Sequence, residues 1–316
     1  METIDVATMP KASTSAAPPP PTAAETQSTF ASQLASVPEF ESYGPVVNSS
    51  KLVPLTESET EYFVTCVKHI FKEHIVFQFN ATNTLPETVL EGVSVLMQPG
   101  GEGLTEDFII PIPSLAAADG SQIVYVSFTR DSPEEYFIGG FGCTLKFVSK
   151  EIDHDTGMPE ETGYPDEYHL EEIEVSAGGD YILPSYCSFN AEWEGLGGGT
   201  EMEEEFGLSG MASIKGGCST CRLVALWLII ITLVMCDTAA CESLVEILNM
   251  EAIGGTENPS SNAVHTLLLS GIVGGGGGKV LARCQMAYTA STGVSLRMSV
   301  RAENDKAASL VIATIG

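Results

Sequence analysis

Short runs of β-branched and aromatic residues dominate the first half of the chain. They lie at 62–67, 75–80, 90–97, 123–128 and 143–148, with turn-forming clusters such as ProGlyGlyGlu (99–102) between them. Helical periodicity is not convincing anywhere in this half. Several short strands at such spacing are typical of an antiparallel sandwich. The pattern therefore predicts an immunoglobulin-like β-sandwich over residues 51–178.

The second half mixes two periods. Residues 185–193 favour a strand, whereas apolar residues spaced i, i+4, i+7 and i+8 from Ala240 predict an amphipathic helix. Further strands are predicted at 264–273, 279–288 and 294–301, with a short closing helix at 307–315. Period-two alternation places Arg297 and Arg301 on one face of the last strand. We expect residues 179–316 to form a smaller α+β platform domain.

The first 37 residues are rich in Ala, Ser, Thr and Pro, with four consecutive prolines at 18–21. Such a composition buries too little apolar surface to offset the backbone entropy lost on ordering. We therefore predict a disordered, flexible hinge over residues 1–50. A tether is the simpler function for it, and a proline-motif ligand is the alternative.

Residues 216–236 differ from everything around them. Their apolar core, Leu223 to Cys236, is 14 residues long and apolar on every side. It is shorter than the roughly 18–20 residues that span a bilayer. Our hypothesis is that this insert is a translated intron, which transcript sequencing would test. The alternative is a membrane-anchored protein that uses residues 217–240.

Charge excludes one class of partner. The chain has 42 acidic and 14 basic residues, a net charge of −28. Nucleic-acid affinity depends on Lys and Arg displacing counterions, so no nucleic-acid partner is expected. The start of the sequence lacks an apolar signal core, and the eight cysteines have irregular spacing. These features favour a cytoplasmic chain with reduced thiols.

Motifs for catalysis or cofactors are not convincing. The five histidines show no His-Glu-x-x-His spacing, and the acidic segment 151–174 lacks the regular oxygens and central glycine of a calcium loop. Gly274–Gly278 precedes Lys279, but a phosphate loop needs Ser or Thr next and Val280 stands there. The pair Cys218 and Cys221 is a weak redox signal on its own. We expect a non-enzymatic protein without metal or cofactor.

One region is locally basic. Residues 258–302 contain no acidic residue, but they include Lys279, Arg283, Arg297 and Arg301. On an acidic protein, such a surface should attract acidic peptide segments of a partner. An ordinary solvated strand face is the alternative. The acidic segment 201–205 is interpreted as a solvated face as well.

Several segments together resemble the appendage of coatomer gamma subunits. They are PheAlaSerGlnLeuAlaSerValProGluPhe (30–40), ThrGluSerGluThrGluTyrPheVal (56–64), LysHisIlePhe (68–71), ValPheGlnPheAsnAlaThrAsnThrLeu (76–85), GlyTyrProAspGluTyrHisLeuGluGluIleGluVal (163–175), SerPheAsnAlaGluTrp (188–193), ThrLeuLeuLeuSerGly (266–271) and IleAlaThrIleGly (312–316). The resemblance covers roughly residues 30–215 and 240–316, in order. In this family one helix runs through the position where residues 216–236 are inserted here.

The resemblance implies a hinge followed by a sandwich and a platform, the outermost portion of a COPI coat subunit. Such an appendage has no catalysis of its own. It recruits accessory proteins, notably an Arf GTPase-activating protein, in Golgi-to-ER and intra-Golgi transport. The location would be cytoplasmic and peripheral, on Golgi membranes and COPI-coated vesicles. The helical trunk through which the family contacts other coatomer subunits is absent here. A clathrin-adaptor appendage is the close alternative.

The resemblance also implies a binding site. Alternation along 185–193 places Trp193 with Phe189 and Ala191, which by itself favours a core position. The family's platform patch instead centres on a tryptophan that matches Trp193, flanked by arginines that match Arg283 and Arg301. In that arrangement an indole on the open surface anchors an apolar side chain while guanidinium groups hold carboxylates. Lys279 and Arg297 are added from the basic run alone.

Overall fold

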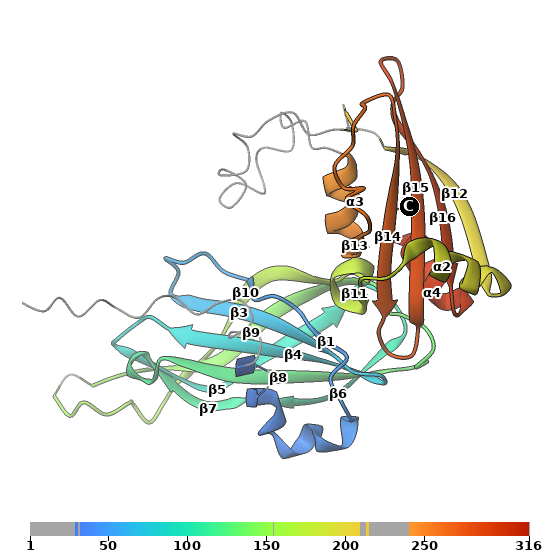
Figure 1. Cartoon of the computed structure of the whole chain (residues 1–316). Helices are drawn as coiled ribbons and strands as arrows, with labels where there is room; N and C mark the ends of the chain where they lie inside the picture. The colour runs from blue at the N-terminus through green and yellow to red at the C-terminus, as the bar shows by residue number, and fades with distance from the viewer. Residues whose placement is uncertain (1–28, 31, 154, 209–212, 215–239, 316) are drawn as a thin grey trace, which may run out of the picture.

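The computed structural model describes residues 29–30, 32–153, 155–208, 213–214 and 240–315 (Figure 1). The insert at 216–236 and the proline-rich start lie outside these residues, and so do the hypotheses made about them. Among the helices described, none has the length and apolar character needed to cross a membrane.

Two antiparallel sheets form the N-terminal sandwich. The first has the order β1 (Asn48–Ser49), β3 (Tyr62–Ile70), β4 (His74–Asn83), β8 (Ser121–Arg130) and β6 (Leu104–Ile110), with β2 (Val53–Pro54) beside β3. The second has the order β10 (Tyr164–Val175), β9 (Gly139–Glu151), β5 (Thr88–Pro99) and β7 (Ile112–Ala116). Stacked face to face (Figure 1), they confirm the predicted sandwich.

Aromatic side chains fill the space between the two sheets. The ring of Phe77 lies 5.9 Å from Phe128 and 4.8 Å from Phe141, in edge-on arrangements. All three side chains are at most 1% exposed. Such pairs add a directional term to the burial of apolar area, which favours one packing of the core.

Part of the predicted flexible hinge over residues 1–50 packs on the sandwich, whereas residues 1–28 and 31 lie outside the described residues. Leu34 and Phe40 are 2% and 4% exposed, and Phe40 belongs to a 3-10 helix, Pro38–Tyr43. They cover apolar side chains on the outer face of the first sheet: Phe71, Val76 and Tyr125. An apolar outer face requires a cover, and the few large apolar residues in this Ala- and Ser-rich segment provide it.

A second sheet-based domain follows. Its sheet has the order β11 (Ile182–Pro184), β14 (Val264–Val273), β15 (Gly278–Thr289), β16 (Gly293–Ala302) and β12 (Thr200–Leu208), with β13 (Glu251–Ala252) beside β14. Helices α3 (Ala240–Leu248) and α4 (Asp305–Ala313) pack on one face, and α2 (Phe189–Gly195) packs on the other (Figure 1). The predicted α+β domain is confirmed.

One predicted strand is wrong. Residues 185–193 do not form a strand, because Phe189–Gly195 is the helix α2. Phe189 and Trp193 are buried while Ala191 between them is exposed, which is the helical arrangement rather than the alternation we expected. The described sheet also has β12, which the sequence pattern did not predict.

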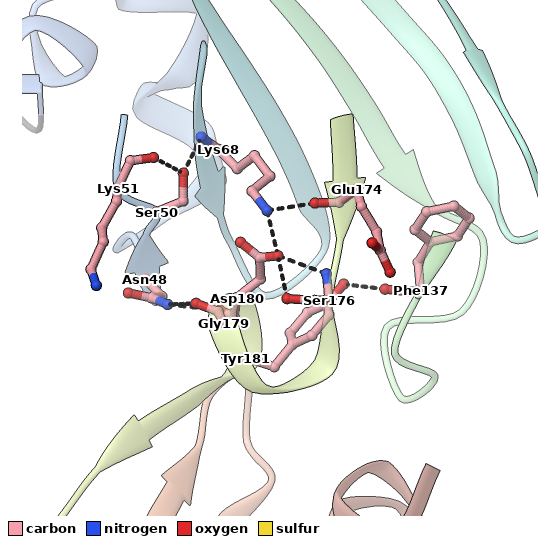
Figure 2. Close-up of polar contacts among 10 residues, drawn as sticks. All are labelled: Asn48, Ser50, Lys51, Lys68, Phe137, Glu174, Ser176, Gly179, Asp180 and Tyr181. Carbon is pink, nitrogen blue, oxygen red and sulfur yellow. Dashed lines mark hydrogen bonds and ion pairs between the residues drawn. The ribbon is translucent and has the colours of Figure 1, made fainter. Parts of the chain in front are cut away.

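A buried ion pair joins the two domains (Figure 2). Lys68 Nζ on β3 lies 2.7 Å from Asp180 Oδ2 in the turn Ala177–Tyr181, and their side chains are 9% and 0% exposed. The same carboxylate oxygen accepts a hydrogen bond from the backbone N–H of Ser176, and Tyr181 Oη donates to the carbonyl of Phe137. Gly178 is required here, because a Cβ would lie 1.9 Å from the carbonyl oxygen of Ile247 on α3.

We expect Asp180→Ala to destabilise the protein by about 3–5 kcal/mol, because it leaves the buried Lys68 ammonium without its counter-charge. The matched control is Lys146→Ala, which removes an exposed ion pair with Glu167 and should cost less than about 1 kcal/mol. Denaturant unfolding measures both. Equal losses would show that the Lys68–Asp180 pair does not stabilise the joint between the domains.

The order of the leading segment predicts its response to Phe40→Ala. Amide hydrogen exchange across residues 33–45 should be slow in the parent protein and at least about tenfold faster in the variant, because Phe40 is the main buried ring of that segment. Ser42→Ala, at an exposed neighbouring position, should leave exchange unchanged. Fast exchange in the parent protein itself would support the flexible hinge instead.

Candidate functional site

The helix α2 docks on the outer face of the C-terminal sheet through two aromatic residues. Phe189 and Trp193 are one helical turn apart, and their rings stack with centroids 5.3 Å apart at an angle of 17°. They pack with Leu281 of β15 and with Ile253. The seven-residue helix has little intrinsic stability, so this packing holds it in place.

Two arginines from neighbouring strands converge on the indole of Trp193. The guanidinium carbon of Arg283 on β15 lies 4.4 Å from the ring centroid, and that of Arg301 on β16 lies 4.6 Å from it. Antiparallel pairing sets Arg301 opposite Leu281 and Arg283 opposite Ser299, which makes the arginines diagonal neighbours on one face. The structure therefore brings together the three residues on which the site prediction centred.

The indole is not on the open surface, which corrects the part assigned to it. Trp193 is 6% exposed, because Leu281, Phe189 and the two guanidinium groups surround it. Cation–π contact in a partly desolvated setting stabilises such a cluster by about 1–2 kcal/mol per pair. The ring therefore positions the arginines and presents little surface of its own.

Arg301 fixes α2 as well as the ring. Its Nη1 donates a hydrogen bond of 2.7 Å to the carbonyl oxygen of Trp193, and its Nη2 lies 3.0 Å from Glu201 Oε2 on β12. A cation on a carbonyl near the end of a helix satisfies a group that has no partner within the helix. Arg301 is thus committed to contacts within the chain.

The other two predicted cations are also paired. Arg297 Nε lies 2.8 Å from Glu203 Oε1, and this contact lowers the pKa of Glu203 and raises that of Arg297. Lys279 Nζ lies 2.9 Å from Glu192 Oε1 on α2, and the hydrogen bond raises the pKa of Lys279. Arg297 lies away from the indole, toward the opposite end of β16.

The partners of these arginines come from a segment that we had interpreted as a solvated face. Strand β12 runs beside β16 with Glu201 opposite Arg301, Glu203 opposite Ser299 and Glu205 opposite Arg297. The alternate glutamates of 201–205 match the alternate arginines of 297–301. That complementary alternation was the signal that sequence reasoning missed. The predicted basic surface is therefore largely neutralised.

Arg283 differs from its neighbours. Within the described part of the chain no hydrogen bond or ion pair is formed by its guanidinium, which contacts only the rings of Trp193 and Phe189. The side chain is half-buried. A planar fork of N–H donors held flat against an aromatic face has its edge free for a carboxylate. The cluster can therefore bind an acidic group without covalent chemistry.

The remaining described groups offer no second site of this kind. Across the described ranges no cluster of three or more His, Cys, Asp or Glu side chains could hold a metal ion. Burial raises the pKa of the Cys143 and Cys284 thiols to about 12. Such thiols are inert as nucleophiles near neutral pH.

Both halves of the chain match models of one protein family. Residues 28–176 match the coatomer gamma subunit appendage platform subdomain, and residues 235–315 match the coatomer subunit gamma-1 C-terminal appendage platform. The chain belongs to the coatomer gamma appendage family. Both family models are named after the platform, although the first match covers the sandwich of this appendage.

Several coatomer gamma subunits are similar to this chain over most of its length. Coatomer subunit gamma-2 of Xenopus tropicalis is 35% identical over 92% of this chain and 30% of its own length. A probable coatomer subunit gamma of Schizosaccharomyces pombe is 38% identical over 90% of this chain and 29% of its own length. Coatomer subunit gamma of Drosophila melanogaster is 36% identical over 90% of this chain and 30% of its own length. The chain thus spans about 30% of these relatives, and the matches favour coatomer over the clathrin-adaptor alternative.

A solved structure, the yeast GGA1 GAE domain, has a TM-score of 0.27 and 8% identity, covering 40% of this chain and 98% of its own. At that TM-score the likeness supports no inference about this appendage.

We expect Arg301→Ala to lower the free energy of unfolding by about 1.5–3 kcal/mol, because it removes two charge-assisted hydrogen bonds and part of the cover of the indole. Arg297→Ala is the matched control on the same strand. It should cost clearly less, since the Arg297 ion pair is exposed to solvent. Denaturant titration compares the two, and similar losses would contradict the structural role given to Arg301.

Proposed function

We propose that this appendage is a non-enzymatic interaction module of the COPI vesicle coat. It would recruit accessory proteins, such as an Arf GTPase-activating protein, during Golgi-to-ER and intra-Golgi transport. The place of action would be the cytoplasmic face of Golgi membranes and COPI-coated vesicles, with peripheral attachment through the coat. Family membership supports the coat assignment. Contacts with other coatomer subunits would belong to the part of the relatives that this chain does not span.

The observation that supports a docking role is the free edge of Arg283. The chain carries a net charge of −28, so most of its surface repels acidic segments. At the α2 cluster, Trp193 holds the guanidinium of Arg283, and Arg301 holds Trp193. A partner carboxylate that reaches Arg283 meets a donor fork of fixed orientation, which costs little conformational entropy on binding.

The five residues of the site have unequal parts in this proposal. Arg283 donates hydrogen bonds to the partner's carboxylate, and Trp193 and Arg301 hold the Arg283 side chain in position. Lys279 and Arg297 lie at the margins, where each is paired with a glutamate. An acidic partner segment gains from these two only by competing with those glutamates, so their effect on affinity should be smaller.

The test is binding of a purified Arf GTPase-activating protein to the full chain. Arg283→Glu should weaken binding at least about tenfold, because a charge reversal removes the carboxylate contact and adds repulsion. Lys51→Glu makes the same reversal of charge at an exposed position of the sandwich and should leave affinity unchanged. Isothermal titration gives the affinities, and thermal unfolding confirms that both variants fold.

Two results would overturn the proposal. One is unchanged affinity in Arg283→Glu, which removes the cluster from the docking site. The other is an absence of binding by the parent chain, which removes this partner. Two further variants test the same site. Trp193→Ser should weaken binding because Arg283 loses the indole on which it lies. Arg283→Gln, which keeps the indole, should also weaken binding.

A further inference from the structure

The outer face of the C-terminal sheet does not end at the α2 cluster. Along β15, Gln285 and Ala287 follow Arg283 on the same face, and both line a groove of about 640 Å³. Its lining comes from four adjacent strands and includes Val264, Thr266, Gln285, Ala287, Ser295 and Arg297. The helix α2 lies across one end of β15 and β16 (Figure 1), and no residue of α2 lines the groove.

The groove exists because the side chains at its floor are small. Ala287 on β15, Ser295 on β16 and Gly207 on β12 are direct cross-strand neighbours. Larger side chains rise around them, including Arg297 and Val264, and Val264 is 66% exposed. An apolar side chain of a partner that enters the hollow would bury Val264 and remove its apolar surface from water.

Two polar side chains at the groove are unused within the described chain. Neither Thr266 nor Gln285 makes a side-chain hydrogen bond to another described residue, and both side chains are exposed. On the β12 side, Glu205 is 79% exposed and only 4.0 Å from Arg297, whose closer partner is Glu203. Glu205 and Arg297 are the charged residues that line the groove, so its rim has no net charge that would attract a carboxylate, and it suits an uncharged segment.

We propose that the groove is the second half of the docking surface, and this rests on the function proposed above. A single extended peptide of the accessory protein places a carboxylate on Arg283 and an uncharged apolar side chain in the groove against Val264 and Ala287. Two residues of a strand span about 6.6–6.8 Å. Because Ala287 lies four residues beyond Arg283, the apolar residue follows or precedes the acidic one by about four positions of an extended peptide.

This arrangement gives the appendage a means of discrimination. A peptide that is acidic throughout meets Glu205 beside Arg297 after its contact with Arg283, so its further carboxylates gain no net attraction. A peptide with one acidic end and one apolar end fits both parts. The surface thus selects spacing and polarity within the partner segment, which a lone cationic site cannot do.

The proposal is tested with substitutions that fill the groove with a large side chain. In the full chain, Ser295→Trp should weaken binding of the same Arf GTPase-activating protein at least about fivefold, because the indole occupies the volume that the partner needs. Tryptophan suits an exposed strand position, so the fold should be retained. Ser114→Trp, at an exposed strand position of the sandwich, is the matched control and should bind like the parent. Thr266→Trp fills the groove from β14 and should repeat the loss.

The outcomes separate the two proposals. Loss in both groove variants, with Ser114→Trp unchanged and all melting temperatures preserved, supports the extended surface. Parent-like affinity in a folded Ser295→Trp or Thr266→Trp, while Arg283→Glu still loses binding, rejects the groove and leaves the Arg283 site intact. An absence of binding by the parent chain rejects both.

Discussion

The packing of the Trp193 indole against Leu281 is the contact on which the outer face of the C-terminal domain depends. A seven-residue helix has no independent stability, so α2 stays on the sheet through this ring and its stacked neighbour Phe189. The same indole supplies the flat surface on which Arg283 lies. Loss of the ring would therefore release both the helix and the guanidinium, and a structural role and a binding role cannot be separated at Trp193 alone.

Strand register decides which cation stays available. The pairing of β12 with β16 brings a glutamate to Arg301 and another to Arg297, and Glu192 on α2 reaches Lys279. These pairs are partly exposed, so each adds little to stability, but each occupies the donors of its cation. Arg283 lies one strand further from the acidic edge and keeps its donors. Among the four described basic residues on the outer face of this sheet, Arg283 is thus the one without a glutamate partner.

The sequence predicted the strands best where alternation had one interpretation. Residues 294–301 alternate strictly and form β16 as expected. The segment 185–193 was ambiguous, because a separation of four between Phe189 and Trp193 fits both a strand and a helix, and only the exposed Ala191 decides between them. The prediction for residues 32–50 differed from the structure for another reason. Its Ala-, Ser- and Pro-rich composition favours disorder, yet Leu34 and Phe40 suffice to cover an apolar sheet face.

For the candidate site, the sequence predicted that Trp193, Arg283 and Arg301 lie together, which the structure shows, but not how they are buried and paired. Neither the burial of the indole nor the pairing of Arg297 and Arg301 follows from composition, because both depend on which strands become neighbours. The glutamates of β12 are distant in sequence from the arginines that they neutralise, and β12 itself was not predicted. Only the sheet order shows that they share a face.

The same sheet order explains why a groove and a cationic site can serve one ligand. Antiparallel strands place residues two apart on one face at about 6.6–6.8 Å, so Arg283 and the floor of the groove are separated by a length that a short extended peptide covers. The helix α2 packs on Leu281, which precedes Arg283 on this face, whereas Gln285 and Ala287, which follow it, line the groove. A peptide that contacts Arg283 therefore has one open direction along β15, and that direction leads into the groove.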